Sequence, residues 1–268
     1  METISKEGIG IKGAFGAVGI LLFAMIVCSP ILLLHNIVDE ELETMLFYIA
    51  SVGGAFFIMR AVFGFSGNQF KSDNIKTVLL VIMATFAIQI GISTPISDMI
   101  PMPNFMKEIF IKFASQTSIF SFITIVIAAP IFEELIFRGI VLRGLLNRYA
   151  PMKAILISSI LFGLIHLNPW QFIGATIIGL FMGWVYYKTG NLLLTIAIHF
   201  ANNFVGFILL LFFDPRTMME MPLADQYGGT TYFILIIIAA LTIGALCLFM
   251  LKNEFAKRDG TPIVQQLN

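Results

Sequence analysis

The sequence predicts an all-α protein, a polytopic bundle of about eight transmembrane helices that forms a single integral membrane domain over residues 1–268. Hydrophobic residues make up 58% of the 268 residues and charged residues only 12%, whereas soluble domains average about 25% charged residues. So few charges cannot cover a water-soluble domain of this size, and the apolar excess excludes a disordered chain. The sixteen basic and sixteen acidic residues cancel, so nucleic acid is not an expected partner.

Eight apolar segments approach or exceed the length of about 20 residues that a membrane-crossing helix needs. They cover residues 14–35, 45–65, 76–97, 117–142, 152–168, 170–188, 190–213 and 231–251. The first follows two lysines as a signal peptide would, but its apolar core is long and seven more segments follow, so we expect a retained signal-anchor. The two weakest segments, 152–168 and 170–188, meet at Asn168-Pro169 and should form a tight pair. We expect short connections throughout the bundle.

The lysines and arginines predict that both termini lie in the cytoplasm, because cytoplasmic loops are enriched in these residues. With the N-terminus inside, thirteen of the sixteen basic residues fall on the cytoplasmic side. The three on the outer side are Lys107, Lys112 and Arg216. The short loops and the lack of an organelle-targeting signal indicate a multi-pass protein of a bacterial plasma membrane.

Three of the apolar segments contain polar residues, and an ionisable group costs about 2.5–3.5 kcal/mol at such a position on insertion scales. These residues are Glu133, Glu134 and Arg138 in the fourth segment, His166 in the fifth, and His199 and Asn203 in the seventh. Residues four apart share a helix face, so Glu134 should pair with Arg138. Glu133 points about 100° away and lacks a partner on its own helix. Such a carboxylate binds a proton more readily in a low dielectric, as a general base must.

Helix geometry predicts a similar depth for Glu133, His166 and His199. Counted from the cytoplasmic basic residues, each lies roughly 15–22 Å along its helix, in a hydrocarbon core about 30 Å thick. Pro130 should kink the fourth helix and free a carbonyl group, as expected beside a polar cavity. Taken singly, the ion pair could be structural, each histidine a packing residue and Asn203 a helix–helix contact. Their common depth favours a functional site.

These residues resemble the CAAX protease and bacteriocin-processing family of intramembrane endopeptidases, also called the Abi family. The family pattern is E-E-x-x-x-R, then F-x-x-x-H, then H-x-x-x-N. The chain matches it without a departure, in the order Glu133-Glu134 with Arg138, Phe162 with His166, and His199 with Asn203. The resemblance covers roughly residues 117–210, which would be the protease core.

The resemblance implies peptide-bond hydrolysis inside the membrane. It assigns water activation to Glu133 and His166, oxyanion stabilisation to His199 and Asn203, and orientation of the site to Glu134 and Arg138. Whether a metal assists stays open. The family is often described as metalloproteases, and Glu133, His166 and His199 could hold a divalent metal such as zinc. However, H-E-x-x-H is absent, and we favour a metal-free glutamate mechanism.

The expected partners are the lipid bilayer and a membrane-embedded or lipid-anchored peptide or protein substrate. The resemblance implies prenylated C-terminal CAAX tails as substrates in eukaryotic relatives, and more often leader peptides, bacteriocin-related peptides or signalling pro-peptides in bacterial ones. Prenylated CAAX tails are therefore less expected here. Two other functions stay open. One is a catalytically silent regulator, scaffold or bacteriocin self-immunity protein. The other is a proton-coupled transporter, which the lack of a clear internal repeat disfavours.

Overall fold

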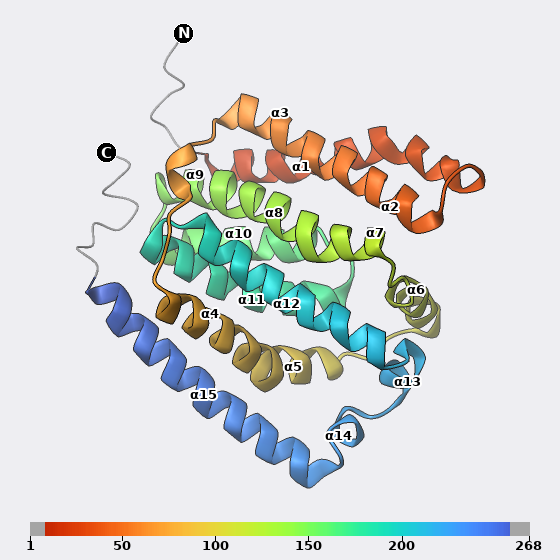
Figure 1. Cartoon of the computed structure of the whole chain (residues 1–268). Coiled ribbons are helices and arrows are strands. Elements are labelled where there is room, and N and C mark those ends of the chain that lie inside the picture. The colour runs from red at the N-terminus through yellow and green to blue at the C-terminus, as the bar shows by residue number, and fades with distance from the viewer. Residues whose placement is uncertain (1–8, 258–268) are drawn as a thin grey trace.

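The computed structural model describes residues 9–257, and within that range the chain forms helices and no strand (Figure 1). Six helical runs are long and apolar enough to cross a membrane. They are Ile11–Leu34, Glu40–Phe63, Ile75–Asp98, Ile119–Leu146, Leu192–Phe212 and Thr230–Ala256. The prediction of an all-α transmembrane bundle is confirmed.

The fifth and sixth predicted segments correspond to α10 (Pro151–Leu164) and α11 (Pro169–Thr189), which pack against one another. Neither is among the six runs, and α10 has only 14 residues. The Asn168 side chain caps α11 by accepting a hydrogen bond from the backbone N–H of Gln171 at 2.8 Å. The fifth segment therefore ends four residues before its predicted end at 168, and His166 lies in a turn rather than in a helix.

The helices form three layers in Figure 1, and the middle layer carries the residues singled out from the sequence. One outer layer contains α1 (Ile11–Cys28), the 3₁₀ helix η1 (Ser29–Asn36), α2 (Glu40–Tyr48) and α3 (Gly54–Phe63). The other contains α4 (Ile75–Ile88), α5 (Thr94–Asp98) and α15 (Thr230–Ala256). Between them lie α7 (Ile119–Phe122), α8 (Ala129–Glu134), α9 (Arg143–Leu146), α10, α11 and α12 (Leu192–Phe212). A short 3₁₀ helix, η3 (Gly67–Gln69), lies between α3 and α4.

Four π-helical segments interrupt the described long helices. They are η2 (Ile49–Gly53), η4 (Gln89–Ser93), η5 (Ile123–Ala128) and η6 (Leu135–Leu142). Such segments are rare and occur frequently at functional sites. Here η5 precedes α8, and η6 begins directly after Glu134. Two of these four segments therefore flank the short helix that carries the paired glutamates.

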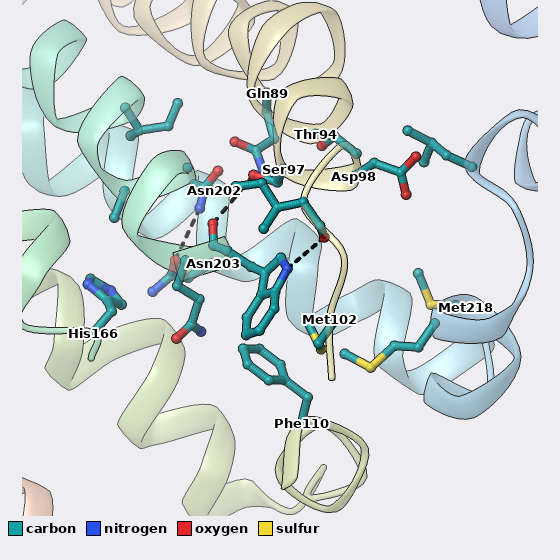
Figure 2. A pocket seen from close by; sticks show the side chains of 18 of the residues that line it. Gln89, Thr94, Ser97, Asp98, Met102, Phe110, His166, Asn202, Asn203 and Met218 are labelled. Carbon is teal, nitrogen blue, oxygen red and sulfur yellow. Dashed lines mark hydrogen bonds between the residues drawn. The ribbon is translucent and has the colours of Figure 1, made fainter. Parts of the chain in front are cut away.

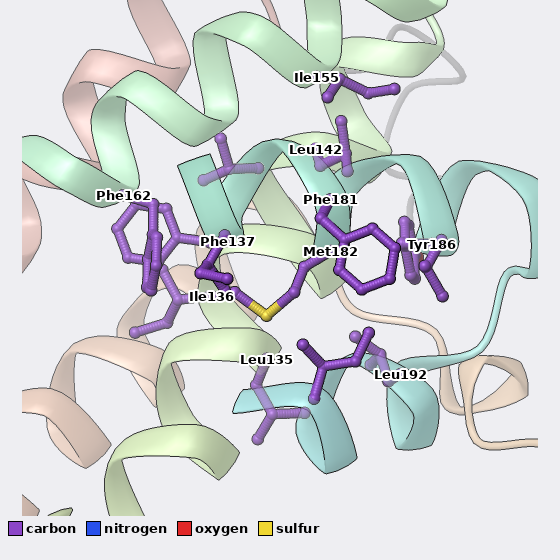
Figure 3. Packing of buried hydrophobic residues seen from close by; sticks show 14 of the residues in the cluster. Leu135, Ile136, Phe137, Leu142, Ile155, Phe162, Phe181, Met182, Tyr186 and Leu192 are labelled. Atoms are coloured by element: carbon purple, nitrogen blue, oxygen red, sulfur yellow. The ribbon is translucent and has the colours of Figure 1, made fainter. Parts of the chain in front are cut away.

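Side chains from the middle layer make most of the apolar core (Figure 3). Phe137 and Phe162 meet edge to face, with 5.3 Å between ring centroids. Met182 of α11 is fully buried. By contrast, α1 and α15 expose large apolar side chains, such as Phe23 at 65% and Phe249 at 64%. An apolar outer surface over a well-packed interior is what a lipid environment requires.

Two of the connections are not short, contrary to the prediction. They contain α6 (Asn104–Ala114), α13 (Pro215–Glu220) and α14 (Leu223–Gln226). We call these three helices, together with residues 99–103, the cap. The Arg216 guanidinium donates two hydrogen bonds to the Glu108 carboxylate, at 2.9 and 2.7 Å, and so joins α13 to α6. This contact holds the pKa of the Glu108 carboxyl below its ordinary value.

The cap lies at the end of the bundle opposite to the start of α1 and the end of α15 (Figure 1). At that opposite end, the backbone N–H of Ile11 donates to the Tyr149 hydroxyl at 3.2 Å, and Lys76 pairs with Glu254 at 3.4 Å. Both ends of the described chain therefore lie at one end of the bundle, as an even number of crossings requires. Which side of the membrane that end faces stays a prediction.

Candidate functional site

Glu134 and Arg138 form a fully buried ion pair in the middle layer. Nη1 of Arg138 donates to Oε1 of Glu134 at 2.7 Å, and both side chains are 1% exposed or less. Nη2 of Arg138 donates to the carbonyl of Gly179 in α11 at 3.2 Å. The guanidinium also lies over the Phe162 ring, 4.4 Å from its centroid. The pairing predicted from the four-residue spacing is confirmed, and Arg138 additionally connects the fourth helix to α10 and α11.

His199 contacts both glutamates from α12. Its Nδ1 lies 3.1 Å from Oε1 of Glu134, and its Nε2 lies 4.0 Å from Oε2 of Glu133. A carboxylate only accepts hydrogen bonds, so Nδ1 carries a proton. Nε2 is then the ring nitrogen directed at Glu133. Oε1 of Glu134 thus accepts hydrogen bonds from both Arg138 and His199, and the second of these bonds fixes the orientation of the His199 ring.

Glu133 has a partner that the sequence analysis did not foresee. The Tyr48 hydroxyl, at the end of α2, donates to Oε1 of Glu133 at 2.8 Å. The expectation that Glu133 lacks a partner was correct for its own helix but wrong for the folded chain. Oε2 of Glu133 is buried without a hydrogen-bond partner. Tyr48 therefore occupies one carboxylate oxygen and leaves the other directed toward His199.

Nothing in the sequence distinguished Tyr48. It follows the acidic run at the start of the second predicted span, where interfacial tyrosines are common. The π-helical segment η2 begins at the next residue. Only the packing of α2 beside the fourth helix brings Tyr48 to Glu133.

His166 lies in the turn after α10. Its Nδ1 is 3.0 Å from the Phe162 carbonyl oxygen, so Nδ1 carries the proton and Nε2 has a free lone pair. The Phe162 ring stands edge to face to both imidazoles, 5.4 Å from that of His166 and 5.6 Å from that of His199. His166 makes no ion pair with Glu133 or Glu134. Phe162 thus separates the two histidines, and His166 lies farther from Glu133 than His199 does.

Asn203 bonds to a carbonyl group that Pro130 frees. In η5 the backbone N–H of Ala129 donates to the Thr124 carbonyl, five residues back. The next bond in that register would join residue 130 to Ile125, but proline has no N–H. Nδ2 of Asn203 donates to the Ile125 carbonyl instead, at 2.8 Å. The predicted free carbonyl is therefore present, and one of the two amide hydrogens of Asn203 is used to satisfy it.

A cavity of about 620 Å³ lies beside these residues and reaches the cap (Figure 2). His166, His199, Asn202 and Asn203 line it on the side of the bundle core. Glu133 is not among the lining residues, but His199, 4.0 Å away, is. The side chains that converge here can offer a carboxylate oxygen, an imidazole and an amide N–H to a substrate in the cavity.

The donor set does not fit a zinc site. Zinc in proteins is held by at least three protein ligands about 2 Å from the metal. Among residues 9–257 no three His, Cys, Asp or Glu side chains converge as a metal-binding group. Of the candidate ligands Glu133, His166 and His199, only Glu133 and His199 approach one another. We therefore derive no chemical step through a metal.

Comparisons with known proteins match the part of the chain that holds these residues. Residues 115–205 match the family model for type II CAAX prenyl endopeptidase Rce1-like proteins. Over this segment the chain is similar to the Rce1-like family. The segment contains all six residues singled out from the sequence, so the resemblance to the CAAX protease family is confirmed. The six apolar helical runs and the Rce1-like match together indicate that the chain is a multi-pass integral membrane protein.

A curated relative covers a smaller part. The UPF0177 protein YxdF of Lactococcus lactis subsp. lactis (strain IL1403) is 33% identical over 81 residues, which are 30% of this chain and 44% of the relative. The chain thus matches less than half of the length of that relative. No solved structure matches the chain.

The buried ion pair gives a prediction about stability. Arg138→Met leaves Glu134 charged and without its guanidinium, so we expect the free energy of unfolding in detergent to fall by about 3–5 kcal/mol. Arg216→Met removes an exposed pair, which solvent screens, and should change the stability far less. The double variant Glu134→Gln/Arg138→Met should recover part of the loss. Equal stability of the Arg138→Met and Arg216→Met proteins would contradict the assignment.

Proposed function

We propose that the chain is an intramembrane endopeptidase that hydrolyses peptide bonds of membrane-associated peptides or proteins, with Glu133 as the general base. The match to an endopeptidase family favours this function over a silent scaffold, a self-immunity protein or a transporter. One observation carries the proposal. A buried carboxylate oxygen of Glu133 without a hydrogen-bond partner lies 4.0 Å from Nε2 of His199, and His199 lines the cavity.

This spacing suits the attacking water. Two hydrogen bonds of about 2.8 Å that meet at one water oxygen can join atoms 4.0 Å apart. Glu133 removes a proton from that water, and the hydroxide attacks the scissile carbonyl carbon. After the attack, two oxygens sit on one tetrahedral carbon, one beside Glu133 and the other beside Nε2 of His199. Glu133 then passes the proton to the leaving amine as the C–N bond breaks.

His199 and Asn203 are the proposed donors to the oxyanion. Because Nδ1 of His199 is bonded to Glu134, its Nε2 faces Glu133. When it carries a proton, Nε2 can donate to the developing oxyanion. The second amide hydrogen of Asn203, the one not bonded to Ile125, is a further donor.

The remaining residues have supporting roles in this proposal. Glu134 and Arg138 orient the His199 ring. His166 lines the cavity with Nε2 free, and we assign it a share in holding and polarising the water. Tyr48 is a positioning residue, because its hydroxyl occupies Oε1 of Glu133 and leaves Oε2 for the water.

Glu133→Gln tests the general base. We expect cleavage of a quenched fluorescent peptide library in proteoliposomes to fall by about 10²- to 10⁴-fold, the usual contribution of general acid–base catalysis. Glu43→Gln is the matched control, since Glu43 is another buried glutamate of a membrane span and makes no ion pair with His166 or His199. Cleavage that persists in the Glu133→Gln protein would exclude Glu133 as the base. If the wild-type protein cleaves no peptide of the library and still produces its cellular phenotype, the result would favour a scaffold.

Tyr48→Phe tests the positioning residue. Without the hydroxyl the Glu133 carboxylate can rotate, and we expect kcat to fall about 10- to 100-fold while KM and the thermal unfolding temperature hardly change. Tyr232→Phe, at a lipid-exposed position of α15, should leave kcat unchanged. A rise in KM with unchanged kcat would place Tyr48 in substrate binding instead.

Chelators test the metal-free mechanism. Since only Glu133 and His199 approach one another, and zinc needs about three protein ligands, EDTA or phenanthroline should leave the cleavage rate unchanged. The rate is measured before and after dialysis against each chelator. Loss of activity that zinc restores would contradict this mechanism.

A further inference from the structure

The cavity beside the histidines extends well beyond the residues proposed for the chemistry. His166 and Met218 lie on opposite sides of it in Figure 2. Along α12, Phe212 lies thirteen positions after His199, which is about 20 Å at 1.5 Å per residue, and the chain leads into the cap from there. An extended peptide advances about 3.3–3.6 Å per residue, so a segment of roughly six residues can lie between the cap and His199.

Five carboxamide side chains line this path, namely Gln89, Gln171, Asn202, Asn203 and Gln226. The side chain of Gln89 makes no hydrogen bond within residues 9–257, although Gln89 sits in a helix of a membrane span. The others keep unused capacity. For example, Nδ2 of Asn202 donates to Asn203, which leaves Oδ1 of Asn202 free, and Gln226 uses only its amide hydrogens, on the carbonyls of Met218 and Met221.

Carboxamides suit the backbone of a peptide. Each has a donor and an acceptor and can pair with a peptide N–H and C=O whatever the side chains are. They are also uncharged, so they can be placed in a membrane protein at lower cost than Lys or Glu. A prenyl chain along the same path would leave these amides unpaired, which is unfavourable in a buried site. The lining therefore favours a polypeptide backbone over an isoprenoid.

The cap supplies the contacts for side chains. Met102, Met218, Met219 and Met221 line the cavity there, and methionine adapts its shape to varied apolar groups. Apart from the two histidines, Asp98 and Lys107 are the charged residues of the lining, one of each sign. Such a surface accepts apolar side chains with little demand on sequence.

Contacts at the mouth hold this part of the cavity in place. Nε1 of Trp170 donates to the Ile100 carbonyl at 2.9 Å, and the Trp170 ring packs edge to face on Phe110 of α6. The ion pair of Arg216 with Glu108 joins α13 to α6. The cap is thus a structured part of the binding site, at the end of the bundle away from Ile11 and Ala256 (Figure 1).

We propose that this cavity binds an unprenylated peptide segment in extended form, which enters through the cap from the outer side of the membrane and is held mainly through its backbone. The outer side is the one predicted for the cap by the thirteen basic residues on the opposite side. The inference rests on the proposed function, since it names the substrate class and the access route of the same site.

Binding is measured apart from cleavage, with the full-length Glu133→Gln protein in nanodiscs. The probe is a fluorescein-labelled nine-residue peptide of alternating leucine and alanine. A second peptide has the same side chains with alternate backbone nitrogens methylated, and a third ends in a farnesylated cysteine. We expect the first to bind, the methylated peptide to bind at least tenfold more weakly, and farnesylation to give no gain. Gln89→Met should weaken binding of the first peptide roughly five- to tenfold.

Gln116→Met is the matched control, because Gln116 is half-buried but does not line the cavity. Equal binding of the methylated peptide, an unchanged affinity in the Gln89→Met protein, or a farnesyl peptide that binds tenfold better would overturn the inference. Binding as expected with no cleavage by the wild-type protein would leave the inference standing and remove the proposed function. Cleavage with none of the expected binding effects would overturn the inference and leave the proposed function standing.

The access route has its own test in intact cells. In a protein whose Cys28 and Cys247 are replaced by alanine, Met221→Cys should react with a membrane-impermeant maleimide, and the leucine–alanine peptide should slow the reaction. Lys252→Cys, an exposed position near the opposite end of α15, should react only after permeabilisation. The reverse labelling pattern would exclude access from the outer side.

Discussion

The site depends on one carboxylate. Glu134 is fully buried, and its Oε1 is shared by Arg138 at 2.7 Å and His199 at 3.1 Å. Burial of an ionised group in a membrane bundle is costly unless its partners are close and well oriented. Once Glu134 is paired in this way, the fourth helix, α10, α11 and α12 are fixed relative to one another through its partners and their contacts to Gly179 and Phe162. The neighbouring Glu133 takes no part in this ion pair, as the role proposed for it as a general base requires.

Local spacing in the sequence was enough to predict part of this arrangement. The pair Glu134–Arg138 follows from a four-residue separation on one helix. The free carbonyl near Pro130 follows from the missing N–H of proline. Each depends only on helix geometry, which a sequence reports directly.

The contacts that could not be predicted join helices that are distant in the chain. Tyr48 reaches Glu133 across 85 positions, and Asn203 reaches Ile125 across 78. The apolar pattern of a sequence indicates which helices are buried, but it does not indicate which helix faces contact one another. The cap was not predicted either. Its helices α6 and α13 are too polar to be recognised as membrane spans and too short to be recognised as a separate domain. The Rce1-like match covers neither Tyr48, Gln89 nor the cap. Tyr48, Gln89 and the cap therefore lie in segments with no recognisable motif.

The π-helical turns before and after α8 have a further consequence. Each π turn holds one more residue than an α turn needs. The half of the fourth helix nearer the cap and the segment with Glu133 are therefore rotated relative to one another by a surplus residue. Loss of a single residue within Ile123–Ala128 would return this stretch to ordinary pitch and turn the half nearer the cap by about 100°. The carbonyl that Asn203 now satisfies would change its direction and its bonding. Length changes in this stretch should therefore be far less tolerated than substitutions among its apolar side chains.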